Sequence, residues 1–514
     1  MAILFLLLLS TLLIVSILFS AKRRSLPNRR PPFPPGPKGW PVLGNLPQLG
    51  SKPHQTLHSL SQKYGPLLGL RLGHVHVVVA SSASTAAMFF RTHDANFSSR
   101  PPNSGAEHVA YNYQDLVFAP YGERWRMLRR LCALNLFSAK AMEDFGHVRA
   151  GEVARLVWGL KTAQAAVNVG GEVNECATNA LSLVLLGRRV FGGRRDEDQA
   201  AAEEFKELVV ELMKLAGVFN VGDFVHGLGW LDLQGVVSKM KKLHKKMDKY
   251  FCKIMEEHKE KDDGNGKASR DVLSIFMKLK DESNEDGGFT DTHIKALLLN
   301  LFTAGTDTTS STVEWALAEL IQQPSLMAEA QAEIDSIAGR SRLVSESDLP
   351  NLPLLRAIVK ETLRLHPSTP LSLPRVAAEG CEIAGYSIPK GATLLVNIWA
   401  ISRDPSSWPE EPLAFRPERF LAGGFHEGVD VKGGDFELIP FGAGRRICAG
   451  MSLGLRMVQF MTATLVHAFD WRLGEAAGKL DMEEAYGLTL RRATPLVAIP
   501  VPRLTSQAYP KHAY

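Results

Sequence analysis

The pattern of hydrophobic and polar positions along the chain predicts a mainly helical protein. In several long stretches apolar residues recur every three or four positions, which is typical of helices with one buried face. The clearest stretches are residues 203–215, 237–259, 291–322, 325–337 and 354–365. Short strand-like runs occur at residues 68–72, 75–79 and 393–398, and the charged, glycine-containing stretch 259–269 predicts an exposed loop. The fold class expected is mainly α with small β-sheets.

The N-terminus has the pattern of a membrane anchor. Residues 1–21 carry no charge and are rich in Leu and Ile, and Lys22, Arg23 and Arg24 follow at once. A helix of about 20 apolar residues spans a bilayer. A cleaved secretory signal would carry its positive charge before the apolar run, and here no basic residue precedes it. The positive-inside rule then leaves the body of the chain in the cytosol.

The remaining sequence shows no internal repeat and no second proline-rich boundary. We therefore predict three parts: an anchor over residues 1–21, a basic and proline-rich hinge over residues 22–40, and one large folded domain over residues 41–514. Because prolines disfavour helix and stiffen the backbone, the hinge is either a plain linker or a spacer that sets the tilt of the body against the membrane.

Composition excludes several classes of protein. Of the 514 residues 45% are hydrophobic and 22% are charged, as in folded globular proteins. The 59 basic and 54 acidic residues leave a formal charge of +5, too mild a bias to indicate nucleic-acid binding. The five cysteines are scattered without a CxxC pair, which argues against a disulfide scaffold and a multi-cysteine zinc site. They are Cys132, Cys176, Cys252, Cys381 and Cys448.

One of these cysteines lies in an unusual loop. The sequence from Phe441 to Gly450 is FGAGRRICAG, and a helical stretch follows it. Glycines allow a flat ligand to approach the backbone, and amides ahead of a helix stabilise a thiolate. A buried structural cysteine is the plainer interpretation of an isolated Cys. The complete spacing F-G-x-G-x-R-x-C-x-G, however, resembles the cysteine loop of the cytochrome P450 family, and the resemblance extends over nearly the whole chain.

This resemblance implies the cytochrome P450 fold and a haem b cofactor. Cys448 would be the axial ligand of the haem iron, and a thiolate ligand favours cleavage of the O–O bond. Phe441 and Arg446 belong to the same loop, and Arg446 offers a cation to a haem propionate. Trp125, Arg129 and Arg375 match positions that meet the propionates in the family. Since no flavin or dinucleotide motif is present, NADPH electrons would arrive through a separate cytochrome P450 reductase.

A polar run interrupts the apolar helical stretch 291–322. Ala304-Gly305-Thr306-Asp307-Thr308-Thr309 follows residues 297–302, which are apolar except for Asn300. The run is either a solvent-facing patch or the wall of an internal cavity, and its apolar neighbours favour the cavity. By resemblance, Thr308 would hydrogen-bond dioxygen and Asp307 would help to relay protons to it. Cleavage of the O–O bond needs protons delivered to one oxygen, and such a pair of side chains can deliver them.

A charge network is expected further along the chain. Glu361 and Arg364 lie three positions apart on a predicted helix, a spacing that by itself usually marks a weak surface ion pair. Arg419 follows in the sequence FRPERF. In the cytochrome P450 family the matching residues form a buried network that steadies the haem-binding core, so we expect these three to be structural.

Other stretches narrow the resemblance to the flavonoid B-ring hydroxylases of plants. They are residues 94–105, 111–122 and 435–440, whereas 485–490 resembles the version found in 3'-hydroxylases. The implied reaction hydroxylates the 3' position of the B ring of flavonoids such as naringenin, dihydrokaempferol or apigenin, at the endoplasmic reticulum membrane. The chain departs from these relatives at Ser81, at residues 423–426, and at Arg491, which stands where Gln is common.

The resemblance also suggests substrate contacts and leaves alternatives open. The substrate residues expected are Phe118, Ala304, Leu371, Leu488 and Thr489. Flavonoid 3',5'-hydroxylation and the oxidation of another phenylpropanoid are the nearest alternatives. A haem-binding membrane protein without turnover is a more distant one.

Overall fold

The computed structural model describes residues 31–192, 196–225, 227–265, 271–282, 288–474 and 480–510. The predicted anchor over residues 1–21 and the first part of the predicted hinge lie outside these ranges. Among the helices of the described ranges, none combines the length and the apolar character needed to cross a membrane.

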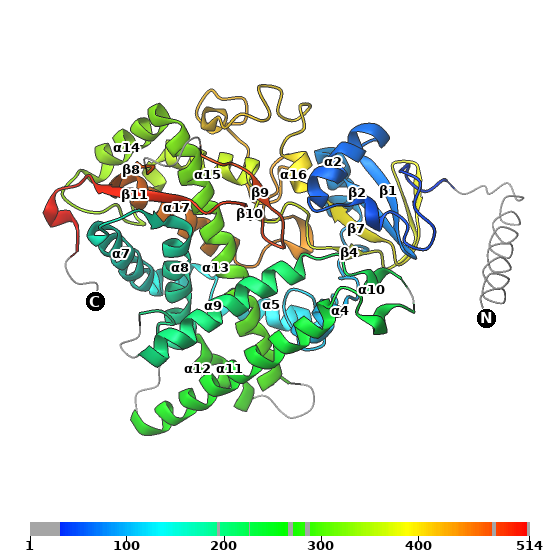
Figure 1. Ribbon diagram of the computed structural model, residues 1–514, viewed down its shortest axis with the longest axis horizontal. Helices are drawn as coiled ribbons and strands as arrows, with labels where there is room; N and C mark the ends of the chain where they lie inside the picture. Colours follow the sequence, from blue (N-terminus) through cyan, green and yellow to red (C-terminus); the bar gives the residue numbers. More distant parts are fainter. Residues whose placement is uncertain are drawn as a thin grey trace, which may run out of the picture.

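Helices make up most of the described chain (Figure 1). The longer ones are α2 (Pro53–Tyr64), α5 (Glu123–Asn135), α7 (Gly146–Thr162), α8 (Val169–Leu186), α9 (Asp196–Ala216), α11 (Val236–Asn265), α12 (Val272–Glu282), α13 (Asp291–Gln322), α14 (Pro324–Ala338), α15 (Pro353–Leu365) and α17 (Met451–Ala468). The short ones are α3 (Ala83–Ala87), α4 (Ser104–Val109), α6 (Ala139–Asp144), α10 (Val221–Phe224) and α16 (Ile398–Ile401). The five predicted helices are confirmed.

Two predicted boundaries were wrong. The loop expected from residue 259 begins later, because α11 continues to Asn265. A helix with a solvent-facing polar side tolerates a run of charges, so charge alone does not mark its end. The strand expected over residues 393–398 ends at Val396, because the Asn397 side chain accepts a hydrogen bond from the Ala400 amide (3.1 Å) and caps α16.

The sheets are small, as predicted. The largest has the strand order β1 (Leu67–Leu72), β2 (Val75–Ala80), β7 (Thr393–Val396) and β4 (Arg375–Val376), with only the β2–β7 pair parallel. It lies with α2 at the right-hand side of Figure 1. The others join β5 (Cys381–Ile383) to β6 (Tyr386–Ile388), β9 (Glu484–Ala485) to β10 (Arg491–Arg492), and β11 (Val497–Pro502) to both β3 (Val167–Asn168) and β8 (Phe469–Arg472).

Helix α13 connects the two halves of the hydrophobic core. Its N-terminal part, from Ile294 to Phe302, packs in a cluster with α9, α11 and α12, and its C-terminal part, from Val313 to Leu320, packs with α7, α14, α15 and α17. Between these parts Ala304 and Gly305 are exposed although their neighbours are buried. In the middle of a buried helix, such exposure marks the wall of an internal cavity.

Candidate active site

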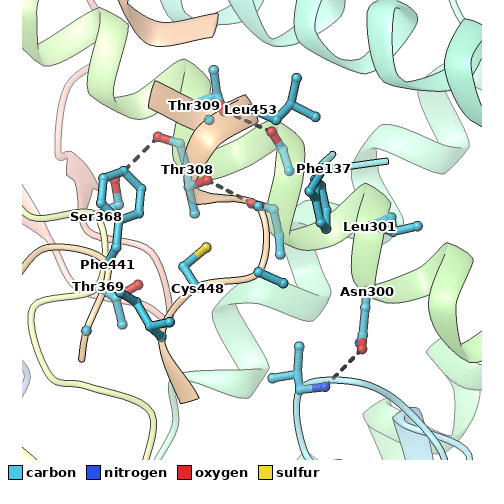
Figure 2. A pocket seen from close by; sticks show the side chains of 18 of the residues that line it. Phe137, Asn300, Leu301, Thr308, Thr309, Ser368, Thr369, Phe441, Cys448 and Leu453 are labelled. Carbon is cyan, nitrogen blue, oxygen red and sulfur yellow. Dashed lines mark hydrogen bonds between the residues drawn. The ribbon is translucent and has the colours of Figure 1, made fainter. Parts of the chain in front are cut away.

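A cavity of about 340 Å³ lies between α13 and the cysteine loop, residues 441–450. Figure 2 shows the Cys448 sulfur pointing into it, with Phe441 beside the sulfur and Thr308 on the α13 wall. Ala304, Gly305 and Thr309 line the same wall. The structure therefore brings the predicted cysteine and the predicted threonine to one cavity, although 140 positions of sequence separate them.

The cysteine loop owes its shape to glycine and to short backbone hydrogen bonds. The Cys448 amide donates to the Phe441 carbonyl (3.0 Å), and the Ile447 amide donates to the Gly444 carbonyl (3.0 Å). Gly444 has φ +67°, and a Cβ there would lie 2.3 Å from Oδ1 of Asp94. A residue with a side chain would adopt this φ only at a cost, and its Cβ would clash with the Asp94 carboxylate. Position 444 therefore requires glycine.

The Cys448 thiol is accessible through the cavity but is otherwise surrounded by protein. Burial raises its pKa, whereas a hydrogen bond from the Gly450 backbone and the positive charge of Arg129 act in the opposite direction. Helix α17 begins at Met451, so the sulfur lies close to a helix N-terminus. The loop thus supplies the groups that stabilise a thiolate once a cation binds it.

Arginines line the same cavity. The three predicted ones, Arg129, Arg375 and Arg446, all line it, and so does Arg100. Burial lowers the pKa of Arg100 well below its ordinary value, and the charges of Arg375 and Arg446 lower it further. Burial also lowers the pKa of Arg375 and of Arg446 to about 10. Several desolvated cations in one cavity favour the binding of an anion.

Most donors of these arginines are engaged by the protein. Arg446 donates to the Ser98 carbonyl (2.7 Å) and the Ala119 carbonyl (2.5 Å), and its guanidinium lies 4.6 Å from the centre of the Trp125 ring. Its Nη1 is buried, and no partner for it occurs in the described ranges. A buried donor without a partner is costly, so it points to an acceptor supplied by a ligand.

These features together fit haem. The cavity offers one thiol for a metal, apolar walls for a flat ring, and cations with a spare donor for the carboxylates of such a ring. Trp125 lines the cavity next to Arg129, as expected for residues that meet the propionates. The signal that would have revealed Arg100 is its place in the stretch 94–105, which carried part of the resemblance.

Thr308 and Asp307 face different surroundings. The Thr308 hydroxyl donates to the Ala304 carbonyl one turn earlier (2.7 Å) and lies at the cavity. The Asp307 carboxylate is not part of the cavity wall; it is buried against β10, where Arg491 contacts Oδ1 through Nη2 at 2.5 Å and Oδ2 through Nε at 3.1 Å. Adjacent helical residues point about 100° apart, which accounts for the difference.

The predicted charge network is present and buried. Glu361 and Arg364, both fully buried, share two hydrogen bonds of 2.7 Å, and Arg419 Nε lies 3.3 Å from Glu361 Oε1. Arg364 also donates to backbone carbonyls of Ser402, Pro412 and Ala414. The network therefore fastens α15 to the segment that precedes the cysteine loop.

A second cavity, of about 560 Å³, adjoins the first. Phe118, Leu371 and Leu488 line it, whereas Ala304 lines the first cavity. Thr489 lines neither: it is 3% exposed, and its hydroxyl finds no partner within the described chain. Four of the five expected substrate residues thus face a cavity, and Thr489 does not.

Two buried polar residues at the junction of the cavities were not singled out from the sequence. Asn300 lines both cavities, and its Nδ2 donates to the Asp115 carboxylate (3.0 Å). The only sequence signal was that Asn300 is the polar exception in an apolar run.

Comparison with known proteins agrees with this geometry. The sequence model of the cytochrome P450 family matches residues 34–498. The chain is 64% identical to "Flavonoid 3'-monooxygenase CYP75B137" of Crocosmia x crocosmiiflora, over 98% of this chain and 99% of that protein. It is 56% identical to "Flavonoid 3',5'-hydroxylase CYP75B138" of the same plant, over 93% and 92% of the two chains. A solved zebrafish cytochrome P450 superposes with a TM-score of 0.72 at 25% identity, covering 88% of this chain and 100% of its own. This chain belongs to the cytochrome P450 family.

Proposed function

We propose that this protein is a monooxygenase that hydroxylates the 3' position of the flavonoid B ring. The observation that carries the proposal is the pair of joined cavities, one with a thiol facing a threonine hydroxyl and the other large and mostly apolar. The high identity to a relative named flavonoid 3'-monooxygenase supports the substrate class. An apolar pocket with a few polar groups suits a planar phenolic substrate.

The residues of the first cavity have distinct roles in this proposal. Cys448 would hold the haem iron, Phe441 would pack beside the ring, and Trp125, Arg129, Arg375 and Arg446 would bind its carboxylates. Bound haem would supply the activation of dioxygen, with electrons from NADPH through a partner reductase. Glu361, Arg364 and Arg419 act structurally, by holding the segment before the cysteine loop.

Thr308 and Asp307 would handle protons from opposite sides of α13. The Thr308 hydroxyl lies at the cavity, where apolar walls limit water, and to donate a proton there it would have to release the Ala304 carbonyl. Asp307 would hold a proton on the side of Arg491, whose side chain is partly exposed and so reaches bulk water. To pass a proton to Thr308 the Asp307 carboxylate must leave Arg491, so the strength of this ion pair affects the supply of protons.

A membrane location completes the proposal. Residues 1–21 would anchor the chain in the endoplasmic reticulum membrane, with the body in the cytosol. Near the N-terminal end of the described chain, several large apolar side chains are exposed: Trp40, Val42, Trp230, Leu231 and Leu233. The turn at Gly73 and His74 connects the two segments that carry these side chains. The Gly73 amide donates to the Leu43 carbonyl (3.0 Å), and the His74 amide donates to the Phe224 carbonyl (2.9 Å). Extraction of the full chain by detergent, and not by alkaline carbonate, would support the anchor.

The test is an incubation of membranes that contain the full chain with reductase, NADPH and naringenin, followed by location of the new hydroxyl group. The proposal expects one hydroxyl at the 3' position and a reduced CO spectrum of the thiolate type. Cys448→Ser should abolish both, because a hydroxyl replaces the iron ligand. A product with hydroxyls at 3' and 5' would instead favour the activity named for the 3',5'-hydroxylase relative, which is 56% identical. A normal spectrum without any hydroxylated flavonoid would refute the substrate class.

A further inference from the structure

The two cavities meet at a short segment that two buried side chains hold in place. These side chains, Asp115 and Asn300, are here called the clamp. Asn300, Ser372 and Leu373 line both cavities. Residues 115–118, here called the junction segment, lie at the same place: Leu116 and Val117 line the first cavity and Phe118 lines the second. The junction segment therefore borders the place where the two cavities meet.

Asn300 binds the backbone of this segment directly. Its Oδ1 accepts hydrogen bonds from the Leu116 amide (2.9 Å) and the Val117 amide (3.1 Å), and its Nδ2 donates to Asp115 Oδ2 (3.0 Å). Figure 2 shows Asn300 at the end of the α13 wall with its oxygen bonded to a backbone nitrogen of the neighbouring loop. Because the oxygen already has two donors, this side chain serves the segment and has no free acceptor for a ligand.

Asp115 closes the clamp from within the segment. Its Oδ1 accepts from the Phe118 amide (2.9 Å), and its side chain is fully buried. It makes no ion pair in the described part of the chain, so neutral donors hold the carboxylate. Arg100 secures the other side, since its Nε donates to the Val117 carbonyl (3.1 Å) and its Nη1 to the Leu373 carbonyl (2.7 Å).

We propose that Asp115 and Asn300 are positioning residues for regioselectivity: by fixing the junction segment they hold Val117 and Phe118 in the orientation that presents one edge of the substrate ring to the first cavity. The inference rests on the proposed function and adds to it the residues that choose the site of attack. Neither residue touches the reacting atoms. Their effect passes through the backbone amides of Leu116, Val117 and Phe118.

An exchange of the two side chains tests this directly. In Asn300→Asp two carboxylates face each other and the Nδ2 donor is gone. In Asp115→Asn residue 115 keeps only one oxygen for the two donors, Asn300 Nδ2 and the Phe118 amide, so each single variant loses one hydrogen bond of the clamp. The double variant, Asp115→Asn with Asn300→Asp, restores a donor and an acceptor in reversed order and keeps the acceptors for the amides of residues 116 and 118. Asn174→Asp is the matched control, because Asn174 also reaches α13, through the Ser310 hydroxyl (3.2 Å), but lines neither cavity.

Two readouts are needed, both on the full chain. The first is the ratio of 3' product to other hydroxylated products from naringenin, in membranes with reductase and NADPH. The second is amide hydrogen exchange of residues 116–118 in the purified protein. Each single variant should lower the product ratio about fivefold, the factor expected for one lost neutral hydrogen bond, and should speed exchange at these amides. The double variant and Asn174→Asp should resemble the wild type.

The outcomes separate this inference from the proposed function. A wild-type protein that hydroxylates no flavonoid refutes the proposed function. A wild-type protein that does so, with single variants that keep its product ratio, refutes the clamp. An altered ratio with unchanged exchange would also refute it, because the side chains would then act by contacting the substrate. If the single variants do not fold, the double variant decides: the clamp requires it to fold and to give the wild-type ratio.

Discussion

Two buried carboxylates hold two segments that line the second cavity, and their surroundings differ. Asp115 holds the segment that ends in Phe118, and Glu484 stands at the start of the turn that carries Tyr486 and Leu488. Asp115 is bound by neutral donors alone. Glu484 accepts hydrogen bonds from His54 (3.0 Å), Gln55 (2.9 Å) and Trp399 (2.9 Å), with the Arg403 guanidinium 3.7 Å away.

This difference shifts the pKa values of the two acids in opposite directions. Desolvation raises the pKa of both. For Asp115 it prevails over the hydrogen bonds from Asn300 and the backbone, and the pKa rises to about 6. For Glu484 the hydrogen bond from His54, the charge of Arg403 and the hydrogen bond from Trp399 outweigh it, and the pKa falls to about 2. Of these two buried acids, Glu484, with three side-chain donors and a guanidinium 3.7 Å away, is the one whose charged form is stabilised.

The largest effect is expected from removing the charge of Glu484. Its lowered pKa corresponds to about 3 kcal/mol of stability at neutral pH, present above pH 4.5 and lost as the pH falls toward 2. Glu484→Gln should therefore lower the free energy of unfolding by about 3 kcal/mol at pH 7 and by less at pH 4. Denaturant titration at both pH values measures this.

Glu483→Gln is the control for Glu484. The Glu483 carboxylate is 70% exposed and pairs with Lys52 at the surface, so its loss should change stability little. Equal losses in the two variants would show that the hydrogen-bonded cluster around Glu484 does not stabilise the turn.

Asp115 should show the opposite dependence on pH. The native state binds the proton of Asp115 more tightly than the unfolded chain, so its favourable contribution is complete below pH 3.8 and is lost as the pH rises toward 6. The free energy of unfolding of the wild type, relative to Asp115→Asn, should fall by about 2–3 kcal/mol between pH 4 and pH 7. A difference that is constant over this range would contradict the raised pKa.

A smaller effect is expected at Arg491, on the same hairpin as Glu484. Arg491→Gln removes the partner of the buried Asp307 carboxylate and should lower the free energy of unfolding by on the order of 2 kcal/mol. Arg491→Lys keeps the charge but not both contacts and should cost less. If the Gln variant is as stable as the wild type, the ion pair between Arg491 and Asp307 does not stabilise the fold. Thermal unfolding of all three proteins makes the comparison.

The features that the sequence predicted are those with a local signal. The length of α13, the cysteine loop and the Glu361–Arg364 spacing each lie within one short stretch. The Asp115 and Glu484 clusters escaped prediction because their partners come from distant elements: Asn300 is 185 positions from Asp115, and His54 is 430 from Glu484. The orientation of Asp307 could have been foreseen, since a helix that turns Ala304 and Thr308 to the cavity turns residue 307 aside.

The smallest effect concerns Thr489, which the sequence placed at the substrate. Its hydroxyl is buried without a partner in the described chain, a state that costs stability. Thr489→Val keeps the shape of the side chain and should raise the free energy of unfolding by about 1 kcal/mol, with an unchanged KM for naringenin. A raised KM without the gain in stability would mean that the hydroxyl finds its partner in the substrate. The turn held by Glu484 would then choose the site of hydroxylation together with the junction segment.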